Sequence, residues 1–293
     1  PLSLLAMSVL YEAWGYEMCE DLTGLKGALE QVEQEARRFP GWQPWAALYR
    51  GDVNRLRGDL EAALSCYEQA AAMTAPGLHQ VWPHAAERRV VTLRLLGRFD
   101  ESLALGRASV GYAIAEDLEP VNVLRTYVAL AAAQTEAGLL TDAAESIASA
   151  LDCAASEGID GVPLAIVHEA RARLAIRHGD GTAFEAARSA CAERLLTGDN
   201  PALTAKYERM LHEARSAGLL QPALRSLEHP SLGKLRAVSD SAERAGQVLA
   251  TLASHFGTDR GWLFGLTAEG SKLIASLGNL AIDDSLWTRV DEY

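Results

Sequence analysis

The sequence predicts an all-α protein built from stacked helix pairs, with a helix and a β-hairpin added at its C-terminal end. Hydrophobic residues make up 49% of the chain, and alanine and leucine, both strong helix formers, dominate them. Apolar residues recur three or four positions apart over most of the chain. Four glycines at the expected turns, Gly58, Gly97, Gly138 and Gly179, follow one another at intervals of 39, 41 and 41 residues. These observations together indicate a repeated helix–turn–helix unit.

The clearest unit spans residues 45–75 and turns at Gly58. Apolar residues of its second helix at Leu60, Ala63, Tyr67 and Ala70 share one face. A glycine inside a helix costs roughly 1 kcal/mol relative to alanine. We therefore expect Gly51, in the first helix of the unit, at a point where the second helix comes close.

The same pattern predicts about five helix pairs. The first pair is looser than the others, and a single helix follows the last pair. The expected helices of the remaining units are 2–18 and 22–39, 81–96 and 99–115, 121–137 and 141–154, 163–178 and 182–195, and finally 202–217.

The unit resembles the tetratricopeptide repeat (TPR), a helix–turn–helix motif that stacks into a superhelical solenoid. Gly51, Ala131 and Ala172 match the small residue of the first helix, and Ala63 and Ala143 match the alanine that opens the second. The TPR period is about 34 residues, so these repeats are longer than the family norm. The resemblance implies that the first helices of successive units line a concave groove.

Beyond the solenoid, residues 232–256 read as one long helix, and residues 260–266 and 271–277 as two strands joined by a turn at 267–270. Residues 241–280 resemble the opening of a GAF domain, a family whose sheet holds a small ligand or mediates dimers. A hairpin that caps the solenoid is the alternative.

We expect three segments, namely a TPR-like domain at 1–219, a linker at 220–231 and a partial GAF-like segment at 232–293. The apolar face of the long helix predicts a homodimer through residues 232–280.

The charge and the cysteine content of the chain indicate which kinds of partner it binds and in which cell compartment it works. The net charge of -12 argues against binding to nucleic acid or to an anionic membrane surface. The four cysteines, Cys19, Cys66, Cys153 and Cys191, form no C-x-x-C motif, so free thiols in a reducing cytoplasm are expected. No stretch predicts a transmembrane helix. The chain begins at Pro1, within an expected helix, and reads as a fragment of a larger bacterial protein.

No motif nominates a catalytic residue, a metal ligand or a cofactor site. His168-Glu169 and His212-Glu213 each begin like a zinc-binding helix, but the second histidine of the H-E-x-x-H pattern is absent from both. The chain itself is therefore expected not to be an enzyme. An enzyme with an unrecognised site is kept as an alternative.

The expected groove follows from the position of each residue relative to its turn glycine. This phase predicts a partner-binding face at Trp45, Leu48, Asp52, Arg55, His84, Glu87, Val91, Arg94, Arg125, Val128, Ala132, Thr135, Ile166, Glu169, Arg173 and Ile176. Arginine binds carboxylates through two parallel hydrogen bonds, so an acidic peptide or protein is the expected partner. The alternative is that these arginines pair with acidic residues of the solenoid itself, such as Glu87.

The function that fits this sequence best is a non-catalytic protein–protein interaction scaffold. Its repeat region followed by a GAF-like start resembles the regulatory middle of large bacterial signalling proteins, whose kinase or ATPase domain lies elsewhere. A sensor that binds a small ligand through the GAF-like segment is the main alternative.

Overall fold

The computed structural model describes residues 4–74, 79–220, 243, 245–250, 259, 261–267 and 270–278. The chain divides into two compact units, Pro1–Gln221 and Pro222–Tyr293. The predicted linker at 220–231, most of the predicted long helix at 232–256 and most of the predicted dimer segment lie outside the described residues. The three predicted segment boundaries and the homodimer stay predictions.

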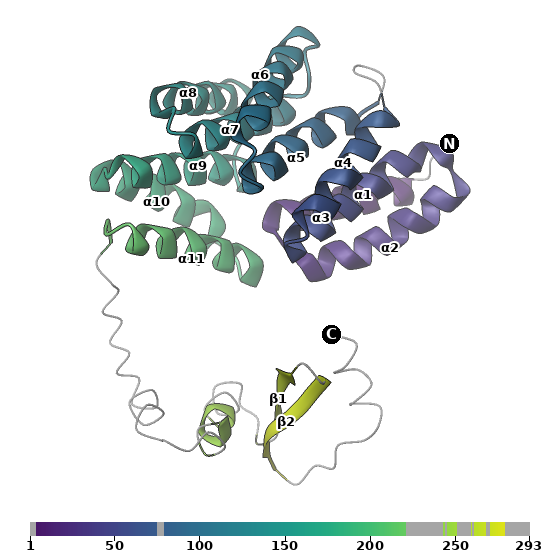
Figure 1. Cartoon of the computed structure of the whole chain (residues 1–293), viewed down its shortest axis with the longest axis vertical. Coiled ribbons are helices and arrows are strands. Elements are labelled where there is room, and N and C mark those ends of the chain that lie inside the picture. The colour runs from purple at the N-terminus through teal and green to yellow at the C-terminus, as the bar shows by residue number, and fades with distance from the viewer. Residues whose placement is uncertain are drawn as a thin grey trace. The chain divides into compact units, whose positions relative to one another are not determined.

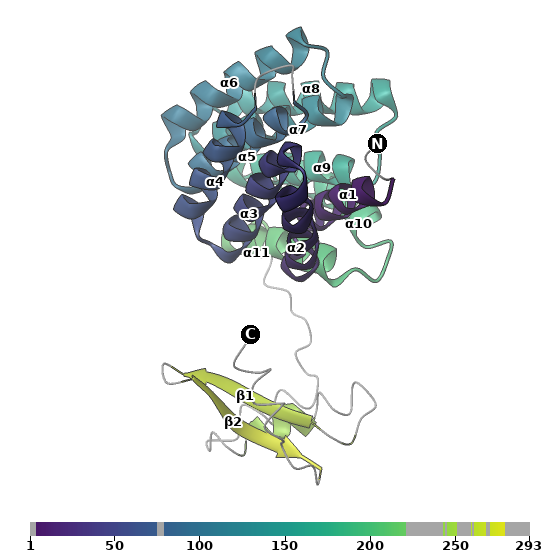
Figure 2. The ribbon, with the colours of Figure 1, turned by 90° about the vertical axis from the view of Figure 1, so that its right-hand side faces the viewer.

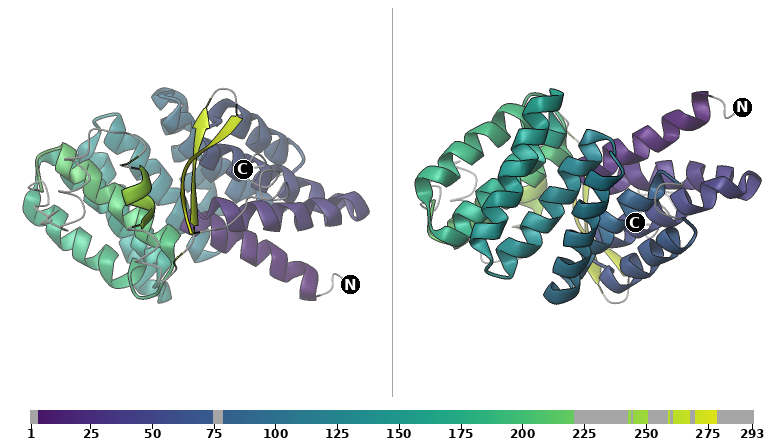
Figure 3. Two further views of the ribbon diagram at one scale, coloured as in Figure 1. Left: turned by 90° about the horizontal axis from the view of Figure 1, so that it is seen from below. Right: turned by 90° about the horizontal axis from the view of Figure 1, so that it is seen from above.

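The first unit is a solenoid of helix pairs, as the sequence predicts (Figure 1). Successive pairs stack side by side around the solenoid (Figure 3). The helices are α1 (Leu4–Cys19), α2 (Leu22–Arg38), α3 (Gln43–Arg57), α4 (Leu60–Ala72), α5 (Val81–Leu95), α6 (Phe99–Ala115), α7 (Pro120–Glu136), α8 (Leu140–Glu157), α9 (Val162–His178), α10 (Gly181–Leu195) and α11 (Pro201–Ser216), with a 3-10 turn η1 (Pro40–Trp42) before α3.

The turn within each of the four later pairs depends on a glycine in the left-handed region, where other residues are strained. The φ angles of Gly58, Gly97, Gly138 and Gly179 are 90°, 74°, 79° and 71°. The predicted turn glycines are therefore confirmed. In the first pair Glu20 takes the equivalent place, with a φ of 60°.

Close packing of small residues holds each pair together. A Cβ atom added at Gly51 would lie 2.5 Å from the ring of Tyr67 in the facing helix α4. This contact confirms the packing reason predicted for that glycine. Ala63 and Ala70 are fully buried in the same interface. Similar clusters of alanine, leucine and valine continue the core through α7–α9 and α9–α11.

The solenoid winds tightly enough for its first and last helices to meet. Helix α1 contacts both α9 and α11, and Figure 2 shows these helices side by side. Cys19, at the end of α1, packs against the hydrophobic cluster of α9–α11. Because α1 meets α9 and α11, the cavity inside the superhelix is lined by residues of α1, α3, α5, α7, α9 and α11.

In the second unit, residues 245–250 are helical, and β1 (Gly261–Thr267) pairs antiparallel with β2 (Gly270–Leu277). The predicted hairpin is thus confirmed, with an irregularity in the register between Leu263 and Phe264. A Cβ atom added at Gly261 would lie 3.2 Å from Leu249, so the helix packs on the first strand. No helix in the described part of the chain has the length and apolarity to cross a bilayer.

Candidate functional site

The concave face of the solenoid carries a cavity of about 880 Å³, which we name the groove. Its walls come from the inner helices α1, α3, α5, α7, α9 and α11. Twelve residues that the sequence assigns to the partner-binding face line it, namely Arg55, Glu87, Val91, Arg94, Arg125, Val128, Ala132, Thr135, Ile166, Glu169, Arg173 and Ile176. The structure therefore brings most of the predicted face together in one concavity.

Six charged side chains meet at one end of the groove in a buried ion cluster, formed by Glu17, Asp52, Arg55, Glu87, Arg88 and Arg125. Arg88 is its centre. Its guanidinium lies 2.5 Å from Glu17 and 2.8 Å from Asp52, and it also pairs with Glu87. Three positive and three negative groups balance one another, as buried charges require.

Glu17, in the last turn of α1, ties that helix to three others. Its carboxylate lies 3.0 Å from Arg55 of α3, 2.5 Å from Arg88 of α5 and 3.2 Å from Arg125 of α7. Burial by itself raises the pKa of this carboxyl, but the charges of Arg125, Arg88 and Arg55 outweigh burial and lower the pKa from 4.5 to about 2. Glu17 is therefore ionised at neutral pH and holds the inner helices around it.

A second set of ion pairs closes the superhelix between α1, α9 and α11. Lys206 of α11 pairs with Glu20 and lies 3.0 Å from Glu169. Arg209 also pairs with Glu20, while Arg173 lies 3.0 Å from both Glu169 and Glu213. The alternative left open by the sequence, that groove arginines pair within the solenoid, is therefore observed. Arg94 likewise pairs with Glu136.

Some donors in the groove remain without a partner. The Nε and Nη1 atoms of Arg125 are buried and have no hydrogen-bond partner among the described residues. Arg177, at the end of α9, is exposed, lines the groove and forms no ion pair within the described part of the chain.

The groove has eight basic and six acidic lining residues, whereas the whole chain has a net charge of -12. Its local charge is thus opposite in sign to that of the protein.

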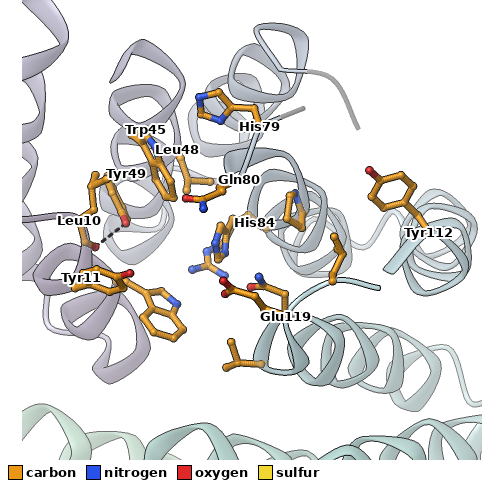
Figure 4. Close-up of a pocket in the computed structure, with 16 residues that line it drawn as sticks. Leu10, Tyr11, Trp45, Leu48, Tyr49, His79, Gln80, His84, Tyr112 and Glu119 are labelled. Atoms are coloured by element: carbon orange, nitrogen blue, oxygen red, sulfur yellow. Dashed lines mark hydrogen bonds between the residues drawn. The ribbon is translucent and has the colours of Figure 1, made fainter. Parts of the chain in front are cut away.

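Three residues of the predicted face lie elsewhere, in a smaller cavity of about 290 Å³. Trp45, Leu48 and His84 line this aromatic pocket, which lies between α1, α3, α5 and the segment from α6 to α7 (Figure 4). Arg88 lines both cavities, so the buried ion cluster separates them. The placement of these three residues in the long groove was wrong, because they lie in the first two turns of α3 and α5, at the other end of the inner helices.

The prediction that Asp52 faces the partner was also wrong. Its side chain is fully buried beneath the groove and has no surface to offer. The Tyr67 hydroxyl donates to its carboxylate at 2.8 Å, and Arg88 Nε donates to the same oxygen at 2.8 Å. Asp52 instead holds Arg88 in place.

Sequence reasoning missed Arg88, Glu17 and Glu20, although a signal existed for each. Arg88 lies nine residues before its turn glycine, a position that is apolar at Tyr49 and Ala129 in the neighbouring units. A charged residue at a core position needs buried counter-charges. Glu20 replaces the turn glycine of the first pair. Glu17 lies three residues before it, just as Arg55 and Arg94 lie three residues before their turn glycines.

Comparisons with known proteins assign no family to the chain. No protein-family model matches the chain, and no curated protein matches it. A similar solved structure is the crystal structure of PilW, described as a widely conserved type IV pilus biogenesis factor. It has a TM-score of 0.47 and 15% identity, covering 87% of this chain and 95% of that chain. A likeness of this degree carries no inference about function. By its own helices and turns, the first unit is a TPR-like α-solenoid with a charged groove.

Proposed function

We propose that the solenoid is a non-catalytic protein-interaction module whose groove accepts an acidic segment of a partner protein. The observation that carries this proposal is the basic excess of the groove in an otherwise acidic chain. A partner carboxylate entering the groove meets a concave surface of positive sign, which favours its approach over that of a basic segment.

Arg177 gives the proposed partner a specific point of attachment, because its exposed side chain lines the groove and forms no ion pair among the described residues. Val128 and Ile176, which line the same groove, supply apolar surface for the stems of the partner's side chains. A cavity of about 880 Å³ holds several side chains, so the partner segment is short.

Arg177→Glu is expected to weaken the binding of a fluorescein-labelled oligoglutamate peptide by roughly tenfold or more, because a like charge then faces the ligand. Fluorescence anisotropy at low salt measures the dissociation constant. Since Arg177 forms no ion pair within the described residues, this variant is expected to keep its helical circular dichroism.

The matched control is Arg171→Glu on the same helix. Arg171 is also exposed, but it does not line the groove. Arg171→Glu changes the net charge of the protein by the same amount as Arg177→Glu, so comparing the two variants corrects for the long-range effect of charge. Equal weakening by both variants, or equal binding of an oligolysine peptide by the unaltered protein, contradicts the proposal.

We also propose the wider setting, a regulatory segment in the middle of a larger cytoplasmic bacterial signalling protein. A small-ligand sensor is the second candidate, favoured by the order of a helix followed by two antiparallel strands, with Leu249 packed on Gly261. That order is the one expected at the start of a GAF-like sheet. We also propose a homodimer through residues 232–280, whichever of the two functions holds.

A further inference from the structure

The aromatic pocket gathers rings in a chain that has few of them. Aromatic residues make up only 6% of the sequence, yet Tyr11, Trp14, Trp45, Tyr49 and Tyr112 all line a cavity of about 290 Å³. Trp45 stacks on Tyr49 with ring centroids 5.9 Å apart and lies 5.8 Å from the ring of His84. The rings come from α1, α3, α5 and α6, so the first three helix pairs are needed to assemble them (Figure 4).

The charges around the pocket favour a cation. Arg88 is the one arginine or lysine among the described residues that line the pocket, and three carboxylates already neutralise it. Burial, together with the charges of Arg88 and Arg125, lowers the pKa of His84 to about 3, so its imidazole is neutral. Glu119, at the start of α7, lines the pocket, is exposed and forms no ion pair among the described residues. One negative charge therefore remains uncompensated at the pocket.

We propose that the aromatic pocket binds a small quaternary ammonium ligand. The face of an aromatic ring carries partial negative charge and attracts a cation, most strongly when the cation sheds little water on binding, as a methylated ammonium does. Glu119, which is exposed and lines the pocket, adds the counter-charge. The volume suits a compact ligand, since small-molecule sites begin at about 300 Å³.

The size and the charge of the pocket determine the probe. Choline is the simplest compact quaternary ammonium ion that suits a cavity of about 290 Å³.

The charge of the ligand is tested with choline against 3,3-dimethylbutan-1-ol, which has the same shape with carbon in place of nitrogen. Isothermal titration calorimetry on the full chain measures both. Choline is expected to bind at least about tenfold more tightly than the neutral alcohol, because only choline gains the cation–π attraction. Equal affinities, or no saturable heat with choline, overturn the proposal.

The site is tested with two carboxylate variants and one ring variant. Glu119→Gln is expected to lower the affinity for choline several-fold. Glu116→Gln changes an exposed residue outside the pocket lining and is expected to leave the affinity unchanged. Trp45→Leu is expected to abolish binding, and circular dichroism shows whether that variant still folds. If it unfolds, Glu119→Gln alone decides, and choline affinity unchanged by that substitution overturns the proposal. Oligoglutamate binding in the groove is read separately in the same variants, so failure here leaves the groove proposal intact.

Discussion

Arg88→Met is expected to lower the free energy of unfolding by about 3–5 kcal/mol, the cost of removing one partner from a buried ion pair. Methionine fills similar space, but it leaves Glu17, Asp52 and Glu87 without the guanidinium that now touches all three. Arg55 and Arg125 then face these carboxylates from the periphery alone. Urea denaturation followed by circular dichroism at neutral pH measures the change.

The control for Arg88→Met is Arg107→Met, which removes an arginine paired at 3.8 Å with Asp142 on the surface. Both partners are about half exposed, and such a pair contributes about 0–1 kcal/mol. Arg88→Lys keeps the charge but loses the planar fork, so its effect is expected to be intermediate. A loss below 1 kcal/mol for Arg88→Met contradicts a central role for the buried ion cluster.

Lowering the pH from 4.5 to 2 is expected to remove about 3 kcal/mol of stability through Glu17 alone. The folded pKa of its carboxyl, about 2, lies below the unfolded value of 4.5. The contribution is therefore fully present above pH 4.5 and is lost as the pH falls through the folded pKa. His84 adds to acid sensitivity at higher pH, because its pKa of about 3 lies below the unfolded value of 6.5.

Glu17→Gln is expected to lower stability at neutral pH and to flatten its dependence on pH between 4.5 and 2. Urea midpoints at several pH values in this window measure the effect. Glu12→Gln is the matched control, since Glu12 lies on the same helix but is exposed. If the two variants lose stability with pH in parallel, the carboxylate of Glu17 does not hold the inner helices together.

Much of the fold could be predicted because each unit repeats local signals. The glycine turns at Gly58, Gly97, Gly138 and Gly179 and the apolar period between them determine where helices begin and end. The closure of α1 on α11 could not be predicted, because it depends on the superhelical pitch. That pitch accumulates from small rotations between pairs and brings Lys206 to Glu20.

The phase of a residue in its helix predicts the direction of its side chain but not its depth in the superhelix. Arg94, Val128 and Arg173 share the groove as expected, since they lie in the middle or last turns of the inner helices. Trp45 and His84 point inward too, yet they lie in the first turns and enter the aromatic pocket. The division between the two cavities comes from Arg88 and its three carboxylates, a tertiary cluster that no local pattern encodes.

The most direct test of the central claim is to map where an acidic peptide lies on the protein. An oligoglutamate peptide with a terminal benzophenone is photo-cross-linked to the full chain, and mass spectrometry locates the attachment. Binding in the groove predicts attachment to inner-helix residues around Val91, Val128 and Ile176, which line it. Attachment mainly to the outer helices α4, α6 and α8, or attachment unaffected by Arg177→Glu, contradicts the claim that the groove receives the partner.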